Sequence, residues 1–218
     1  MIQSKNRYQT KLNILFTAPL KRGLILFVFL VVIQINGIAQ QYTSGDVVAN
    51  FRLPEAGTDS IFHLKEIVDV SAVVLVFFGN ECPYAKLYQE RLLKLYERYS
   101  SSGTVFLVIN SFDDKEYPDE SVDSMKVLWD TLSMPMPYLA DKRGNVARDY
   151  DVKRVPETFV LSPDNEGHFM LRYRGAIDDN PQLAEDTHQD YLEDAIKAVL
   201  NNKAPQKPFV RPVGCNLR

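Results

Sequence analysis

The chain has 218 residues, of which 45% are hydrophobic and 24% are charged, and its formal net charge at pH 7 is −3. This is the composition of an ordinary globular protein, with enough apolar residues for one core in one domain. Residues 41–218 hold 20 Lys and Arg against 28 Asp and Glu, a net charge of −8. That balance argues against phosphate as a ligand, and we expect no nucleic-acid partner.

Residues 1–40 differ from the rest and have the pattern of a secretory signal peptide. They contain five cations and no acid, with an apolar run at Gly23–Ile33 and small residues near Ala39. The run is shorter than the ~20 residues that a membrane-spanning helix needs, so we expect cleavage rather than a retained membrane anchor. The sequence therefore predicts a periplasmic or otherwise exported protein without stable membrane insertion, in a compartment where disulfides persist.

The next segments predict a β-α-β unit. Two short strands are expected first, at Phe51–Leu53 and Ile61–Leu64. Ala72–Phe78 is an unbroken apolar run, typical of a strand buried on both faces. Thr104–Asn110 is a second buried strand, which must run parallel to the first. Between them a helix is predicted from apolar residues at helical spacing, which are Leu87, Tyr88, Leu92, Leu95, Tyr96 and Tyr99.

Shorter patterns predict the remaining elements. Helices are expected at Glu120–Leu132, Asn145–Tyr150 and Thr187–Leu200, and strands at Val155–Leu161 and Phe169–Arg174. Residues 203–218 are rich in proline and should be extended. The sequence thus predicts one domain over residues 41–202, followed by an extended C-terminal tail.

Cys82 lies at the predicted junction between the first buried strand and its helix. Pro83 suits the first helical position, where no backbone donor is needed. Cys82 is therefore the expected N-cap, close to free backbone N–H groups and to the positive end of the helix dipole. That environment favours the nucleophilic thiolate, although the carboxylate of Glu81 opposes it. The alternative is a small, buried apolar residue that fills the strand–helix junction.

The turn and the order of elements resemble a known family. Asn80, Cys82, Pro83 and Tyr84 match the turn Cys-Asn-His-Cys-Pro-Tyr of one bacterial branch of the thioredoxin-like redoxins, which are grouped with the alkyl hydroperoxide reductase and thiol-specific antioxidant proteins. The resemblance implies an α/β, thioredoxin-like fold with a central mixed sheet flanked by helices. Two positions differ from that turn: Gly79 takes the place of the first cysteine and Glu81 that of the histidine. Further short matches to this branch are Val155-Pro156, Arg174–Asn180 and Gly214-Cys215.

The resemblance also implies a place for the substrate. In thioredoxin-like proteins a cis proline at the start of the strand that corresponds to Val155–Leu161 faces the active cysteine. Here that would be Pro156 facing Cys82. Val155 would then offer its backbone to an extended substrate, with Tyr84 as a further substrate-binding residue. The alternative is an ordinary proline at the start of a strand.

The redox partner of Cys82 is left open. Proteins with a Cys-X-X-Cys turn release a mixed disulfide by attack from the other cysteine, and Gly79 has no sulfur. An external thiol could resolve Cys82, Cys215 could return on the extended tail as the resolving cysteine, or the redox cycle could be lost. For Cys215, the alternatives are an incidental thiol in a disordered tail or an intermolecular disulfide.

Peroxide and metal chemistry each lack a complete motif. Typical peroxiredoxins carry Thr-X-X-Cys and an arginine that holds the peroxide; here Gly79 takes the place of the threonine, and Arg154 and Arg174 are candidates only. We expect no metal and no cofactor, because the histidines are isolated and lack the spacing of metal ligands. These histidines are His63, His168 and His188.

We therefore expect an exported thiol-dependent oxidoreductase that uses Cys82, with either a peroxide or a thiol or disulfide of a partner protein as its substrate. One alternative is a redox-inactive thioredoxin-fold module that binds a peptide beside Pro156. A less favoured alternative is a copper-handling protein that uses Cys82 and one histidine.

Overall fold

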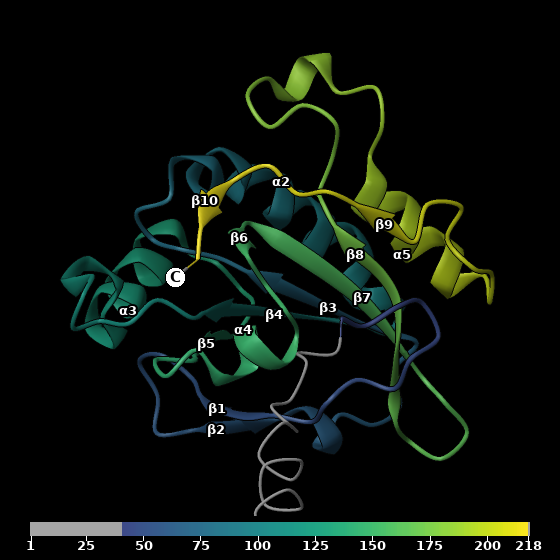
Figure 1. The fold of residues 1–218 in the computed structure, drawn as a ribbon, viewed down its shortest axis with the longest axis horizontal. Coiled ribbons are helices and arrows are strands. Elements are labelled where there is room, and N and C mark those ends of the chain that lie inside the picture. The colour runs from purple at the N-terminus through teal and green to yellow at the C-terminus, as the bar shows by residue number, and fades with distance from the viewer. Residues whose placement is uncertain (1–40, 218) are drawn as a thin grey trace, which may run out of the picture. The chain divides into compact units, whose positions relative to one another are not determined.

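A mixed six-stranded sheet forms the centre of the computed structural model, which describes residues 41–217 (Figure 1). The expected signal peptide at residues 1–40 lies outside the described residues. The strands are, from one edge to the other, β5 (Tyr138–Ala140), β4 (Thr104–Asn110), β3 (Ala72–Phe77), β7 (Glu157–Pro163), β8 (Phe169–Gly175) and β9 (Phe209–Val210). Pairs β5–β4, β4–β3 and β8–β9 are parallel, whereas β3–β7 and β7–β8 are antiparallel.

The position of strand β3 inside the sheet explains its apolar composition. All six of its residues are buried, and it pairs with β4 on one side and β7 on the other. A strand that is covered on both faces must be apolar throughout, as the run from Ala72 to Phe77 is. The predicted parallel pairing of the Ala72–Phe78 run with Thr104–Asn110 is confirmed, with the strand itself ending at Phe77.

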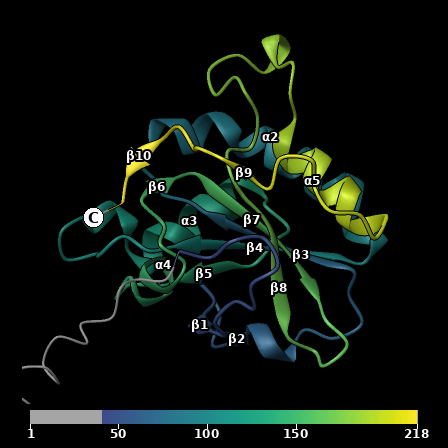
Figure 2. The ribbon, with the colours of Figure 1, turned by 45° about the vertical axis from the view of Figure 1, so that its right-hand side comes forward.

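Helices cover the sheet, as the fold prediction required. α5 packs on β3, β7 and β8, while α3 packs beside β5. α2 and α5 lie side by side in both views (Figures 1 and 2), joined by Arg98 and by the Tyr99 hydroxyl, which both donate to the carboxylate of Glu193. None of the described helices is both long and apolar enough to span a membrane. The helices are α2 (Pro83–Tyr99), α3 (Val122–Leu132), α4 (Asn145–Asp149) and α5 (Tyr191–Leu200), with short 3-10 turns η1 (Leu64–Glu66), η2 (Ser100–Ser102), η3 (Pro118–Glu120) and η4 (Ala184–Asp186).

The inward face of α2 differs from the predicted face, because Leu87 is exposed, Tyr96 is only half-buried and Ala85 is buried. Leu87 was expected to face the core, but it is 47% exposed. Leu87 precedes the buried Tyr88 by one position, and successive helical residues point about 100° apart. The buried stripe is Ala85, Tyr88, Leu92, Leu95 and Tyr99.

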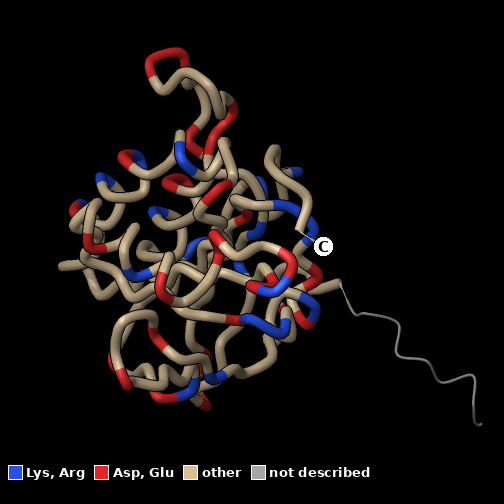
Figure 3. The backbone as a smooth tube through the Cα atoms, turned by 90° about the vertical axis from the view of Figure 1, so that its left-hand side faces the viewer, with Lys and Arg blue, Asp and Glu red and all other residues tan. Residues whose placement is uncertain are grey.

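Helix α5 begins at Tyr191, later than the predicted Thr187. The carboxylate of Asp179 accepts hydrogen bonds from the backbone N–H groups of His188 and Gln189, which holds that segment outside the helix. The preceding residues form a protruding loop that contains η4 (Figure 1). Figure 3 shows acidic residues gathered on this loop.

The remaining strands form two small sheets beside the central one. β1 (Arg52–Pro54) and β2 (Ile61–His63) form an antiparallel hairpin close to the predicted positions. β6 (Arg154–Val155) pairs antiparallel with β10 (Cys215–Asn216), the last strand of the chain. The tail is extended, as predicted, and it is held at two points, by β9 on β8 and by β10 on β6 (yellow in Figures 1 and 2).

Candidate redox site

Cys82 is the N-cap residue of α2, in the turn that leaves β3. Its backbone is extended and Pro83 is the first helical residue, which agrees with the local prediction. The Cys82 side chain is 4% exposed. The adjacent Glu81 forms an exposed ion pair of 2.8 Å with Lys86, which offsets part of the negative charge beside the sulfur.

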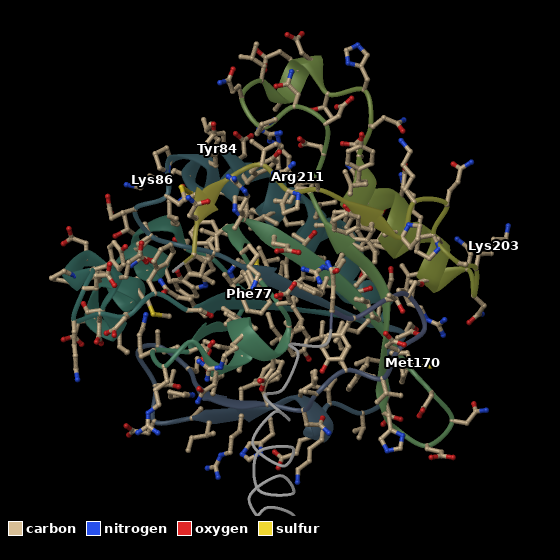
Figure 4. All side chains as sticks on the ribbon, viewed as in Figure 1. Phe77, Tyr84, Lys86, Met170, Lys203 and Arg211 are labelled. Atoms are coloured by element: carbon tan, nitrogen blue, oxygen red, sulfur yellow. A yellow bond between two sulfur atoms is a disulfide. The ribbon has the colours of Figure 1, made fainter. Side chains whose placement is uncertain are left out.

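Cys82 and Cys215 form a disulfide across a sequence separation of 133 residues. Their Cα atoms are 5.9 Å apart, a normal separation for such a bond. Figure 4 shows the yellow sulfur atoms where β10 meets the start of α2. The sequence left three possibilities for Cys215: a pair with Cys82, an incidental thiol or an intermolecular disulfide. The structure has the pair with Cys82.

The peptide bond between Val155 and Pro156 is cis, as the resemblance implied. Val155 pairs in register with Cys215, so the expected extended partner of its backbone is the chain's own tail. The carbonyl oxygen of Val155 lies 3.3 Å from Cys82 Sγ. After reduction, a protonated Cys82 can donate a hydrogen bond to this oxygen.

Tyr84 is the third residue proposed for substrate binding. It is the second residue of α2, it is half-buried, and it packs against the hydrophobic core. Figure 4 labels it near the start of that helix. Its role toward a substrate stays a prediction.

A buried carboxylate supports the turn before Cys82, and the sequence reasoning missed it. Glu120 is 3% exposed and accepts hydrogen bonds from the backbone N–H groups of Asn80 (2.8 Å) and Glu81 (2.9 Å). Asn110 Nδ2 also donates to Glu120, at 2.6 Å. Glu120 comes 38 residues after Cys82 and was predicted only as the start of a helix, so no local pattern indicated this contact.

Two further side chains complete this polar network. Lys142 Nζ donates to Asn110 Oδ1 (2.9 Å) and to the backbone oxygen of Glu120 (2.6 Å). Burial lowers the pKa of Lys142 to about 8, although the carboxylate of Glu120 acts in the opposite direction. The Tyr138 hydroxyl donates to Asn80 Oδ1 at 2.8 Å. The turn that carries Cys82 is thus hydrogen-bonded directly to β5 and η3, and through Glu120 to Asn110 of β4, which restricts the position of the sulfur.

The space beside Gly79 is already filled. A Cβ atom at this position would lie 2.5 Å from Phe112 Cε2 and 3.3 Å from Glu120 Oε1. Real Cβ atoms do not approach a neighbouring atom as closely as the first distance. Glycine stands here in place of the first cysteine of a Cys-X-X-Cys turn, and any side chain at this position would meet the ring of Phe112.

We expect that Gly79→Cys lowers the free energy of unfolding by about 1–3 kcal/mol, because it overpacks the contact with Phe112. Urea unfolding under oxidising conditions measures this change. The matched control adds the same cysteine to a Phe112→Leu chain, where the smaller side chain should make the cost smaller. An equal cost in both backgrounds would show that the Phe112 contact does not limit this position.

The two arginines considered for peroxide binding have other partners. Arg174 is 5% exposed, and its Nη2 pairs with Glu157 Oε1 at 2.7 Å. Burial raises the pKa of Glu157, and the guanidinium of Arg174 partly reverses that shift. Arg154 Nη1 donates to the backbone oxygen of Gly214 at 3.0 Å. Arg174 thus stabilises the core and Arg154 holds the tail, so neither contact favours a peroxide-binding role.

The histidines lie in separate places. His63 lies 3.6 Å from a carboxylate oxygen of Glu66, and His168 lies 3.3 Å from one of Asp164. Among residues 41–217, no group of three or more His, Cys, Asp or Glu side chains is arranged to hold a metal ion. Asp178, within the Arg174–Asn180 stretch, accepts hydrogen bonds from the Tyr88 hydroxyl and from Arg91, and so attaches its loop to α2.

Comparison with known proteins gives curated relatives with thiol–disulfide names. The thiol-disulfide oxidoreductase ResA of Halalkalibacterium halodurans is 26% identical over 123 residues, which are 56% of this chain and 65% of that protein. The chain thus spans slightly less than two thirds of that relative. The protein of the same name from Oceanobacillus iheyensis is 22% identical over 182 residues, 83% of each chain.

A solved structure and a family model complete the comparison. A hypothetical protein from Sinorhizobium meliloti superimposes with a TM-score of 0.72 at 32% identity, covering 81% of this chain and 94% of that one. The model described as the AhpC/TSA family matches residues 44–166, more than half of the sequence. The chain therefore belongs to the AhpC/TSA family of thioredoxin-like redoxins.

Proposed function

We propose that this protein is an exported thiol–disulfide oxidoreductase in which Cys82 is the attacking thiol and Cys215 is the resolving thiol. The observation that carries the proposal is the disulfide between these cysteines, formed at a helix N-terminus and opposite a cis proline. The curated relatives named thiol-disulfide oxidoreductases support the same reaction class. The composition of residues 1–40 supports export.

The reaction begins from the reduced pair. The Cys82 thiolate attacks one sulfur of a disulfide in a partner protein, so a Cys82–partner bond forms and the partner's second sulfur leaves as a thiolate. The Cys215 thiolate then attacks Cys82 Sγ, which releases the first partner thiol and closes the Cys82–Cys215 disulfide. Two electrons pass to the partner, and an external dithiol must return them before the next cycle.

The protein environment favours this sequence of steps. The helix N-terminus stabilises the negative charge that Cys82 needs for attack. The hydrogen bonds from Asn80 and Glu81 to Glu120 fix the turn beside Cys82. The pairing of Cys215 with Val155 brings the second sulfur to the first without a cysteine at position 79.

Reduction of a peptide disulfide with dithiothreitol as the electron donor tests the proposal. The wild-type chain should accelerate thiol release above the rate of dithiothreitol alone, and Cys82→Ser should not. Consumption of hydrogen peroxide, measured in parallel, separates disulfide exchange from peroxide reduction. Equal rates with and without the wild-type chain for both substrates would remove the enzyme assignment.

The second candidate is a binding module in which the disulfide only fixes the tail. The filled space beside Gly79 and the low exposure of Cys82 favour it. This candidate predicts that the native protein keeps its disulfide when dithiothreitol is present, so the same assay distinguishes the two.

A further inference from the structure

We propose that Gly214-Cys215 is an internal copy of the substrate, and that the redox partner presents an extended Gly-Cys pair to Val155 in the same register. This inference rests on the proposed function, because it names the kind of polypeptide that Cys82 attacks. Its new element is a steric requirement for glycine immediately before the partner's cysteine.

Backbone contacts set the register of the tail. Cys215 pairs with Val155 and Asn216 with Arg154, in antiparallel orientation. The backbone N–H of Leu217 donates to the oxygen of Lys153 at 2.9 Å. A foreign polypeptide in extended form can make the same contacts, because backbone groups carry them.

The side chain of Arg154 adds one more contact to the same segment. Its Nη1 donates to the backbone oxygen of Gly214 at 3.0 Å. A backbone oxygen is present before the cysteine of any polypeptide, so this contact is also open to a partner. Arg154 therefore favours an extended segment whatever its side chains.

Gly214 supplies the sequence requirement. A Cβ atom there would overlap the carbonyl oxygen and carbon of Val155, and it would lie 3.1 Å from the nitrogen of Pro156. These are backbone atoms at a cis peptide bond between β6 and β7, so they cannot turn aside as a flexible side chain can. Any residue larger than glycine must move the segment away from Val155 and carry its cysteine away from Cys82.

The residues before Gly214 also lie over a defined surface. A cavity of about 190 Å³ beside Pro156 is lined by Tyr88 and Ile177, by Asp178 and Asp179, and by Arg211 and Val213 of the tail. When the tail leaves, the apolar residues of this cavity and the exposed Asp179 face a partner, whereas the buried Asp178 stays paired with Tyr88 and Arg91. Figure 3 shows acidic residues on the loop that contributes the two aspartates. A partner with a cation before its Gly-Cys pair would match the exposed negative charge of Asp179.

The tail and the partner compete for one place. Because the tail is tethered, its effective concentration at Val155 is high. In the oxidised chain the disulfide holds it there. A partner can therefore reach Val155 only after reduction and displacement of the tail. Cys215 can then attack the Cys82–partner bond only when the tail in turn displaces the partner's segment from Val155.

Two peptides test the glycine requirement on the full chain carrying Cys215→Ser. One is acetyl-Pro-Val-Gly-Cys-Asn-Leu-amide and the other has alanine in place of glycine; each carries 5-thio-2-nitrobenzoate on its cysteine as a mixed disulfide. The Cys82 thiolate attacks the peptide sulfur, the Cys82–peptide bond forms, and the aromatic thiolate leaves because its thiol is the more acidic. Absorbance of that thiolate gives the rate, and intact mass identifies the product. The alanine peptide should react at least about tenfold more slowly, because its extra methyl overlaps Val155.

The same substitution in the tail should act in the opposite direction. In the Cys215→Ser chain, Gly214→Ala weakens the competing tail, so the glycine peptide should react about threefold faster or more. Gln206→Ala, at an exposed position of the tail before β9, is the control and should leave the rate unchanged.

Failure of this inference and failure of the proposed function give different results. Equal rates for the two peptides overturn the glycine requirement, and no acceleration by Gly214→Ala overturns the competition by the tail. In both cases the function stands if the symmetric disulfide of two 5-thio-2-nitrobenzoate groups still labels Cys82 in the Cys215→Ser chain. If that small disulfide also leaves Cys82 unlabelled, the proposed function and the inference both fall.

Discussion

Serine in place of Cys82 should reduce disulfide exchange to the rate of the external thiol alone, whereas serine in place of Cys215 should stop the reaction halfway. The hydroxyl of serine is not ionised at neutral pH and cannot take part in thiol–disulfide exchange. In Cys215→Ser the first attack by Cys82 remains possible. The mixed disulfide then accumulates, because no second sulfur lies beside Val155 to release it.

The size of the effect differs between the two variants. Cys82→Ser should lose all of the rate that the protein adds, and we expect Cys215→Ser to lose at least about 100-fold in steady-state turnover, since an external thiol replaces a tethered one. Intact mass after mixing with a peptide disulfide should show one peptide per chain in Cys215→Ser and none in Cys82→Ser. Full turnover by Cys215→Ser would show that an external thiol resolves Cys82 and that the tail is not part of the cycle.

Reduction of the Cys82–Cys215 disulfide should lower the free energy of unfolding by up to about 5 kcal/mol, because the bond closes a loop of more than 130 residues in the unfolded chain. The domain should nevertheless stay folded. The core and most of the six-stranded sheet lie outside β10, and β9 remains on β8. Reduction should therefore release β10 locally.

Two measurements test the predicted loss of stability and the predicted local release of β10. Urea unfolding of the oxidised and reduced wild-type chain gives the change in stability, with Cys82→Ser as a control that should not respond to the reductant. Hydrogen exchange at the Leu217 amide, which donates to Lys153 in the oxidised structure, reports the release of the tail. Complete unfolding on reduction would indicate a structural disulfide and favour the binding module.

The sequence predicted well the part of the site that neighbouring residues determine. Ala72–Phe77 is buried on both sides, and Pro83 can begin a helix but not continue a strand, so the position of Cys82 at the N-cap followed from local chemistry. The cis bond at Pro156 came from the family resemblance rather than from its own neighbours.

Contacts between distant segments could not be predicted in the same way. Glu120 reaches the turn at Asn80 only because the β3–β4 pairing brings the two loops to one edge of the sheet. Lys142 joins through a further parallel pairing, between β4 and β5. Neither contact has a spacing signal in the chain, because each depends on strand order.

For the tail as well, neighbouring residues predicted the backbone conformation but not the distant segment with which it pairs. Its prolines indicated an extended segment, but an extended segment pairs with whichever edge has free backbone groups. The sequence therefore left several partners open for Cys215. Gly214 now gives a specific reason for its place beside Val155, because only a residue without Cβ fits there.

The central claim is that Cys82 and Cys215 interconvert between disulfide and dithiol in the folded protein. Equilibration of the native chain in dithiothreitol buffers of graded potential, followed by alkylation and intact mass, tests it most directly. We predict one reversible two-electron transition in which both cysteines become alkylated together while the far-ultraviolet circular dichroism of the domain persists. A disulfide that resists every buffer until the chain unfolds would contradict the account.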